Sequence, residues 1–223
     1  RDSSHIDYLS LYESEESFIK FLDFMNGKLE PKDLYQVSTL VDGEYYELST
    51  TLPPTGSSMD IAPTYGSIDV SNFTDLGEIG TFRYWRPKDS KGTPILANKG
   101  CRAKCSFCSV RNFNGKGVRT KSIETVIDEM KYFNDHFNIN HFTWLDDDLF
   151  YDPDRTYRLY NSIVQSGLKI TWDASNGVIV SAATSHPELL DAAEESGCIG
   201  MYFGIESGNE KILRDIHKPS GIK

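Results

Sequence analysis

The chain has 223 residues, a net charge of −10 and a pI near 5.0, and 39% of its residues are hydrophobic, enough for one large domain or two small ones. This acid excess argues against a surface dominated by phosphate-binding cations, so we expect no nucleic-acid partner. No apolar run approaches the roughly eighteen residues of a membrane span, and the N-terminus lacks signal-peptide features.

The N-terminal segment is predicted to form a strand, a helix and a hairpin. Residues 5–11 alternate as a short strand does, and apolar residues recur at helical spacing from Phe18 until Asn26-Gly27 ends the helix. Residues 35–50 predict a hairpin with its turn at Asp42-Gly43. A lone strand and helix cannot bury their apolar faces. We therefore expect the chain to begin inside a domain, or to carry this segment as an appendage.

Residues 51–92 predict an extended linker, because Pro, Gly, Ser and Thr dominate its first part. Tyr84 and Trp85, near its end, are expected to pack against the region that follows as core residues. From residue 93 to 223 strand and helix signals alternate, which predicts a parallel sheet with crossover helices.

Four strand–helix units are predicted in this second region. The strands are expected at 93–98, 141–145, 169–172 and 199–205. The helices are expected to begin at a Ser122 cap, at Asp152-Pro153, at a capping box in Ser185–Glu188 and at a second box in Ser207–Glu210.

Three cysteines follow the first of these strands at the spacing C-x3-C-x2-C. They are Cys101, Cys105 and Cys108, with Phe107 just before the third. A [4Fe–4S] cluster normally takes four Cys ligands, so three local thiolates would leave one iron open to a non-protein ligand. Zinc prefers two separated pairs, and Cys198 is far away in the sequence. A disulfide would leave an odd thiol. The spacing favours a cluster and leaves zinc and structural or redox thiols open.

Polar groups also follow the other strands, where ligand sites of α/β barrels lie. Asp146-Asp147-Asp148 follows the second strand, Asn176-Gly177 the third, and Gly204–Gly208 closes the fourth with Glu206 at its centre. The aspartates suit a cation, and a divalent-metal loop or a solvated turn is the alternative. For Glu206 the alternative is ordinary helix-start chemistry. Alternate strand residues face opposite ways, so the sequence does not identify which aspartate points at a ligand.

These motifs resemble those of the radical S-adenosylmethionine (SAM) superfamily, strongly over residues 93–217 and weakly over 5–80. In that family the open iron is chelated by the amino and carboxylate groups of SAM, and electron transfer from the cluster releases a 5′-deoxyadenosyl radical. The fold is a partial barrel of about six β/α units. Only four units are predicted before the sequence ends at Lys223, and the N-terminal segment is expected to begin inside a domain. We therefore expect a chain that is truncated at both ends.

The resemblance implies roles for each motif. Cys101, Cys105 and Cys108 would hold the cluster and be the catalytic centre. The triplet 146–148 would bind the SAM ammonium, and Gly208 would lie near an anionic group such as its carboxylate. Family members often carry an arginine two residues after the Asn-Gly turn, where this chain has Ile179. The residues implied in cofactor binding are Phe107, Asp146, Asp147, Asp148, Asn176, Glu206, Ser207 and Gly208.

Residues 1–50 resemble the end of the doubly wound B12-binding domain of cobalamin-binding members. Tyr12–Glu15 stands where those members carry a Gly-Glu-Gly-Glu-like turn, and the lower-ligand motif D-x-H-x-x-G is not in this chain. The resemblance leaves open whether cobalamin is bound.

The expected protein is a radical SAM enzyme with a [4Fe–4S] cluster, SAM and, in the cobalamin class, B12 as cofactors. Its expected partners are a small-molecule substrate and a reductant such as flavodoxin or ferredoxin. An oxygen-sensitive cluster implies the cytoplasm. The alternatives are a methylthiotransferase acting on tRNA or protein, and a non-catalytic Fe–S or zinc-binding module. An acidic chain without a basic stripe disfavours RNA.

Overall fold

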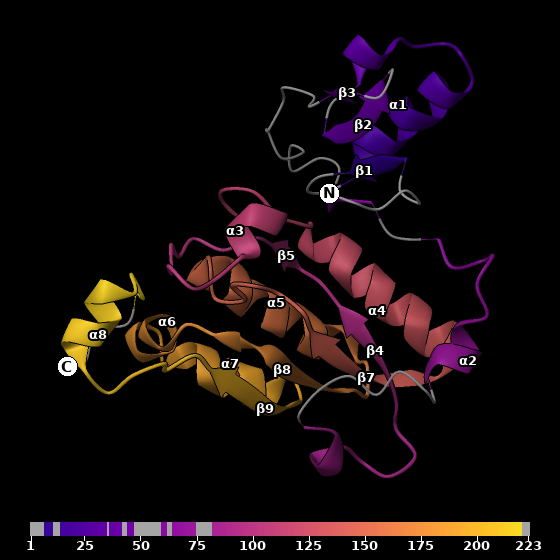
Figure 1. Cartoon of the computed structure of the whole chain (residues 1–223). Coiled ribbons are helices and arrows are strands. Elements are labelled where there is room, and N and C mark those ends of the chain that lie inside the picture. The colour runs from indigo at the N-terminus through magenta and orange to yellow at the C-terminus, as the bar shows by residue number, and fades with distance from the viewer. Residues whose placement is uncertain are drawn as a thin grey trace.

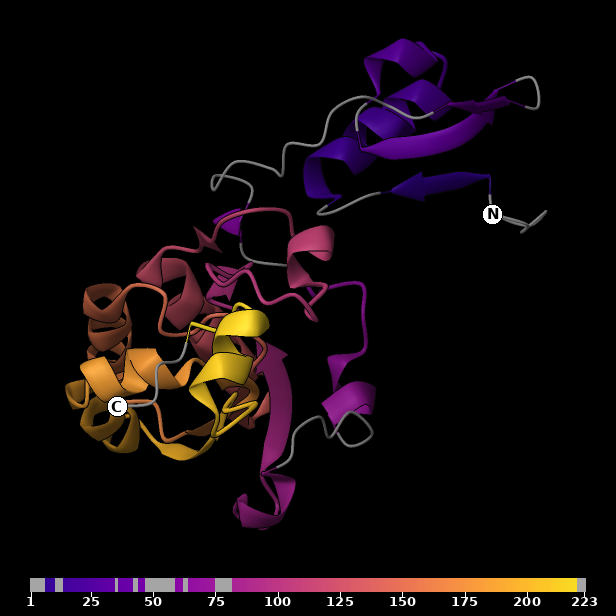
Figure 2. The same ribbon diagram turned by 60° about the vertical axis from the view of Figure 1, so that its left-hand side comes forward.

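The computed structural model describes residues 7–10, 14–34, 36–41, 44–46, 59–61, 64–74 and 82–219. Figures 1 and 2 show a small N-terminal lobe, in indigo, beside a larger α/β region. Lys99 of the larger region bridges to Glu15 of the lobe at 2.7 Å. Within the described residues, no helix has the length and apolar character needed to cross a bilayer.

The lobe is a three-stranded antiparallel sheet packed on one helix. Its sheet has the order β1-β2-β3, so β1 pairs with the hairpin that follows it in sequence. Tyr8 and Phe21 pack on the buried side chains of Leu34 and Val37. The predicted strand, helix and hairpin are confirmed, while the turn at residues 42–43 lies outside the described residues. The elements are β1 (Tyr8–Ser10), α1 (Glu15–Met25), η1 (Pro31–Asp33), β2 (Val37–Val41) and β3 (Glu44–Tyr46).

The predicted linker, 51–92, is described only in part. It contains the short helices α2 (Val70–Thr74) and η3 (Arg83–Trp85). Val70 joins the main core, and the Tyr65 ring lies 4.7 Å from that of Phe133. Part of this segment therefore packs on the larger region. Its assignment as a linker, and that of the lobe as the end of a B12-binding-like domain, remain predictions.

The expectation that Tyr84 and Trp85 fill the core is wrong. They are 78% and 66% exposed. Phe82 takes the packing role instead, because its ring lies 6.1 Å from that of Tyr202 and occupies the space that a side chain at Gly200 would need.

The larger region is built on four parallel strands in the order β4-β7-β8-β9, which confirms the predicted parallel sheet and its four β/α units. The strands are β4 (Lys91–Ile95), β7 (Ile139–Trp144), β8 (Thr171–Val178) and β9 (Cys198–Phe203). The helices that follow them are α4 (Ile123–Phe137), α5 (Pro153–Ser166), α7 (Glu188–Glu195) and α8 (Glu210–Asp215). Four short elements lie between them: β5 (Asn98–Lys99), α3 (Val110–Phe113), β6 (Arg119–Thr120) and α6 (Val180–Ser185).

Two of the four predicted helix starts are confirmed by their caps. The Ser122 hydroxyl accepts a hydrogen bond from the Thr125 N–H at 3.1 Å. The Asp152 carboxylate accepts from the Arg155 N–H at 3.0 Å, with proline at the first helical position. These bonds satisfy N–H groups that a helix start leaves without intrahelical partners.

The other two helix starts differ from prediction. Ser185 ends the unpredicted helix α6, so α7 begins at Glu188 without the expected box. Asn209, rather than Ser207, caps α8, and its side chain accepts from the N–H groups of Lys211 and Ile212. Asn176-Gly177 also lies within β8 rather than after it, because that strand runs to Val178.

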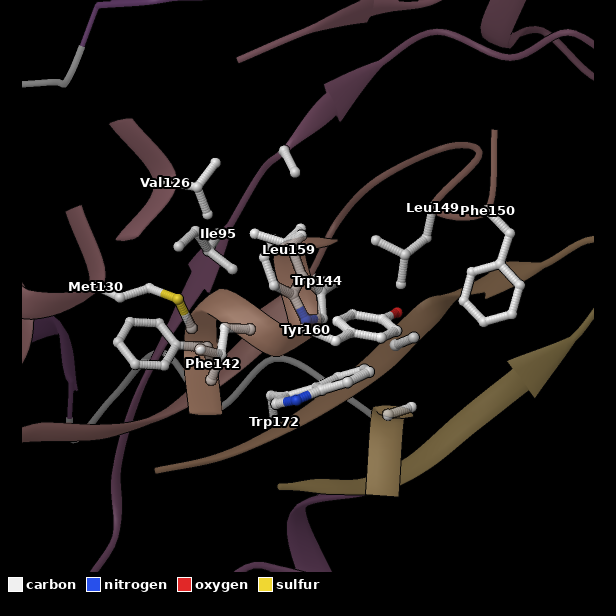
Figure 3. Close-up of a cluster of buried hydrophobic side chains, with 14 of the residues drawn as sticks. Ile95, Val126, Met130, Phe142, Trp144, Leu149, Phe150, Leu159, Tyr160 and Trp172 are labelled. Carbon is white, nitrogen blue, oxygen red and sulfur yellow. The ribbon is translucent and has the colours of Figure 1, made fainter. Parts of the chain in front are cut away.

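The core lies between the sheet and the adjacent helices α4, α5 and α7. Figure 3 shows the ring of Tyr160, from α5, over Trp172 of β8, and the two centroids are 5.0 Å apart. Trp144 meets Trp172 edge-on at 6.1 Å. The Trp172 Nε1 donates to the backbone oxygen and to the hydroxyl of Ser196, each at 3.1 Å. Trp172 therefore joins sheet and helices through packing and through hydrogen bonds.

We expect Trp172→Ala to lower the free energy of unfolding by about 3–5 kcal/mol, because it would leave a cavity in this core. Trp85→Ala is the matched control and should change it by less than about 0.5 kcal/mol, since that side chain is exposed. Urea unfolding of both variants measures the difference. Equal losses would contradict the assigned core.

Candidate functional site

A cavity of about 290 Å³ lies at the carboxyl ends of the strands. Seven of the predicted site residues line it: Cys101, Cys105, Phe107, Cys108, Asp147, Asn176 and Glu206. The other four predicted residues, Asp146, Asp148, Ser207 and Gly208, are not among the described residues that line it. The chain therefore brings the cysteine loop and three different strand ends to one site.

Arg102, within the cysteine loop, anchors the loop to the neighbouring segment. Its guanidinium donates to the backbone oxygens of Phe150 and Tyr151 at 3.0 Å and pairs with the Asp148 carboxylate at 3.0 Å. Within the loop, the Cys108 N–H donates to the Cys105 oxygen at 3.2 Å. The loop is therefore tied to the segment between β7 and α5.

The three aspartates after β7 have separate roles. Asp146 is buried and accepts from the backbone N–H groups of Ala97 and Asn98, at 3.0 and 2.7 Å. Burial raises the pKa of its carboxyl to about 7, against the lowering effect of these two bonds and of the Arg155 charge. Asp146 thus links the end of β7 to the segment that follows β4. Its side chain is buried and does not line the cavity.

Asp147 is the aspartate of the triplet that lines the cavity. Its Oδ2 accepts from the Gly100 N–H at 3.0 Å and from the Asn114 side chain at 2.6 Å. Asp148 turns to Arg102 instead, and among the described residues its buried Oδ1 has no hydrogen-bond partner. Of the three aspartates, Asp147 is therefore the one placed to meet a ligand in the cavity, and its contact with SAM remains a prediction.

The thiols of the loop are partly buried. Burial raises the pKa of Cys101 to about 11, with the charges of Asp148 and Asp147 acting in the same direction. Burial also raises the pKa of Cys105, while the charge of Lys218 opposes the shift. Iron binds thiolates, so its binding here must release protons.

Among the described side chains, no three His, Cys, Asp or Glu lie at the spacing of a single-ion site. Three thiols on one cavity fit the donor set of a cluster with one open iron, and their role as its ligands remains a prediction.

Cys198 lies away from this set. It begins β9, at the end of the strand opposite the cavity, and burial raises the pKa of its thiol to about 12. Its Sγ contacts the backbone oxygen of Gly200 at 3.6 Å. A role as a structural residue fits this position.

The strand ends supply the rest of the wall. The Asn176 side chain donates to the backbone oxygens of Leu145 and Asp146 at 3.0 and 3.3 Å, which joins β8 to β7 beside the cavity. Ile179, at the position where the family often has arginine, also lines the cavity. The Ser207 hydroxyl accepts from the Asn209 N–H at 3.1 Å and so belongs to the turn before α8.

Lys218 is a cavity residue that the sequence did not predict. It follows α8, lines the cavity, and places its Nζ 2.9 Å from Glu206 Oε1. No motif marks it, because it reaches the site from a turn and not from a strand end. Arg111 also lines the cavity, and its guanidinium donates to the Ala103 oxygen at 3.4 Å.

The sequence model of the Radical SAM superfamily matches residues 95–222. Cytidylyl-2-hydroxyethylphosphonate methyltransferase of Streptomyces wedmorensis is 25% identical over the whole chain and 44% of its own length. Bacteriochlorophyllide d C-12(1)-methyltransferase of Chlorobaculum tepidum is 33% identical over 60% of this chain and 28% of its own length.

A structure of the cobalamin-dependent S-adenosylmethionine radical enzyme OxsB shares the fold, with a TM-score of 0.75 over 94% of this chain and 29% of OxsB at 14% identity. The chain spans less than half the length of each of these proteins. The family match covers more than half of the chain and contains the cysteine loop together with the polar strand ends that line the cavity. The chain therefore belongs to the radical SAM superfamily.

Proposed function

We propose that this protein holds a [4Fe–4S] cluster through Cys101, Cys105 and Cys108, binds SAM at the open iron, and starts methyl transfer to a small-molecule substrate. The observation that carries the proposal is that these three thiols and Asp147 line the same cavity. The methyltransferase names of the relatives support the reaction class. When bound, the cluster supplies the electron for reductive cleavage of SAM.

The cavity residues suit the parts of SAM. Asp147 offers a carboxylate oxygen that can accept a hydrogen bond from the amino group of SAM, and the charge of the carboxylate strengthens that bond. Phe107, which is 57% exposed beside Cys108, offers an aromatic face to the adenine. Asn176 fixes the distance between two strand ends and so the width of the site. Ser207 and Gly208 follow Glu206 in the turn before α8, where the Ser207 hydroxyl accepts from the Asn209 N–H.

We assign the N-terminal lobe to the end of a B12-binding-like domain, which makes cobalamin a second cofactor. The surface beside the cysteine loop exposes Phe107 and Phe113 and also carries the exposed cations Lys104 and Lys116. A flavodoxin or ferredoxin, whose surface is acidic, suits such a patch as the reductant. A reducing cytoplasm would protect the cluster.

Anaerobic reconstitution tests the cluster ligands. We expect about four irons per chain and a broad visible absorption in the wild-type protein. Alanine at Cys101, Cys105 or Cys108 should remove both. Cys198→Ala is the matched control and should keep both. Loss of the cluster in Cys198→Ala with retention in Cys105→Ala would refute the assignment.

The aspartates can be separated by substitution. Asp147→Asn should weaken SAM binding about ten- to hundredfold at unchanged iron content, since a hydrogen bond to a charged group contributes roughly 1.5–3 kcal/mol. Asp146→Asn should instead lower the free energy of unfolding by about 1–3 kcal/mol, because its amide would face backbone donors. Equilibrium dialysis and urea unfolding measure the two effects. The same SAM affinity in both variants and in the wild-type protein would exclude an ammonium site at Asp147.

A further inference from the structure

Lys218 is a cation inside a cavity whose proposed ligand carries a carboxylate. Its side chain is 10% exposed, against 77% for Lys211 on the preceding helix. Of the two described cations that line the cavity, Arg111 is turned to the backbone of Ala103, and Lys218 to the carboxylate of Glu206. A buried ammonium needs an anionic partner, since an unpaired one carries a large desolvation cost.

The backbone turn that follows α8 fixes the position of Lys218. His217 has a φ of +55° after α8. The His217 N–H donates to the Arg214 oxygen at 3.0 Å, and the Lys218 N–H to the Leu213 oxygen at 2.9 Å. This is the Schellman pattern, which reverses the chain at a helix end.

Two further contacts fix this turn to the site. The Ser106 N–H, in the cysteine loop, donates to the Ile216 oxygen at 3.0 Å, and the Ser181 hydroxyl donates to the Pro219 oxygen. The turn is therefore attached to the loop that carries the cluster ligands and to α6.

The Lys218 ammonium lies against the end of β9. A Cβ at Gly204 would lie 2.7 Å from the Lys218 Nζ, so the glycine lets the ammonium take this position without a shift of the lysine side chain. Glu206 has a φ of +59°, a left-handed conformation that is strained for a non-glycine residue. Its carboxylate nevertheless reaches Lys218 at 2.9 Å. Backbone strain of this kind gathers at ligand-binding sites.

We propose that Lys218 binds the carboxylate of SAM at the open iron, with Glu206 as the residue that positions its ammonium. The proposal rests on the proposed function and deepens it. It places a positive charge in the cavity wall, where Ile179, directly after β8, supplies none. Asp147 then faces the amino group of SAM, and Lys218 faces its carboxylate.

The test compares Lys218→Met, Lys218→Arg and the control Lys211→Met, which removes an exposed lysine near the same turn. After anaerobic reconstitution, iron content and visible absorption are measured first. Equilibrium dialysis then measures the Kd of SAM and of decarboxylated SAM, which lacks the carboxylate. We expect Lys218→Met to keep the cluster and to weaken SAM about ten- to hundredfold. Its affinity for decarboxylated SAM should stay that of the wild-type protein.

Lys218→Arg should restore SAM binding to within a few-fold, and Lys211→Met should match the wild type. An unchanged Kd for SAM in Lys218→Met would overturn the proposal. So would an equal loss for both ligands, or loss of the cluster in both Lys218 variants, since either result would make Lys218 a structural residue. A wild-type protein that assembles no cluster, or that binds no SAM, would refute the proposed function instead.

Discussion

The site depends on the ladder of hydrogen bonds between the aspartate triplet and the segment that leads from β4 into the cysteine loop. Asp146 binds the N–H groups of Ala97 and Asn98, and Asp147 that of Gly100. Asp148 completes the ladder at Arg102. Three successive carboxylates thus fix the backbone up to the first cysteine. Because two of them are buried, their bonds form in a medium where electrostatic interactions are stronger than in water.

Because of these hydrogen bonds, the three aspartates differ in their structural roles. A sequence motif that resembles a ligand site contains one residue that lines the cavity and two that support it. The supporting residues show how a loop with few internal backbone bonds keeps thiols in place: its rigidity comes from the neighbouring strand end. Arg102 adds the backbone oxygens of Phe150 and Tyr151 to the same support.

The fold was predictable where one local signal decided the structure. The Ser122 and Asp152 caps and the spacing of the cysteines are such signals. Prediction failed where two signals competed. Ser185 and Glu188 have the spacing of a box, but Ser185 completes a short helix of its own. The sequence also carries no mark of tertiary placement, so the exposure of Trp85 and the arrival of Lys218 in the cavity could not be predicted from it.

The bridge between Glu15 and Lys99 has a consequence for the N-terminal lobe. Lys99 directly precedes Gly100 and the first cysteine, so the ion pair joins the lobe to the chain next to the cysteine loop. The Glu15 side chain is 49% exposed, and a pair this accessible contributes at most about 1 kcal/mol and is screened by salt. Raising the ionic strength should therefore weaken this contact between the lobe and the larger region.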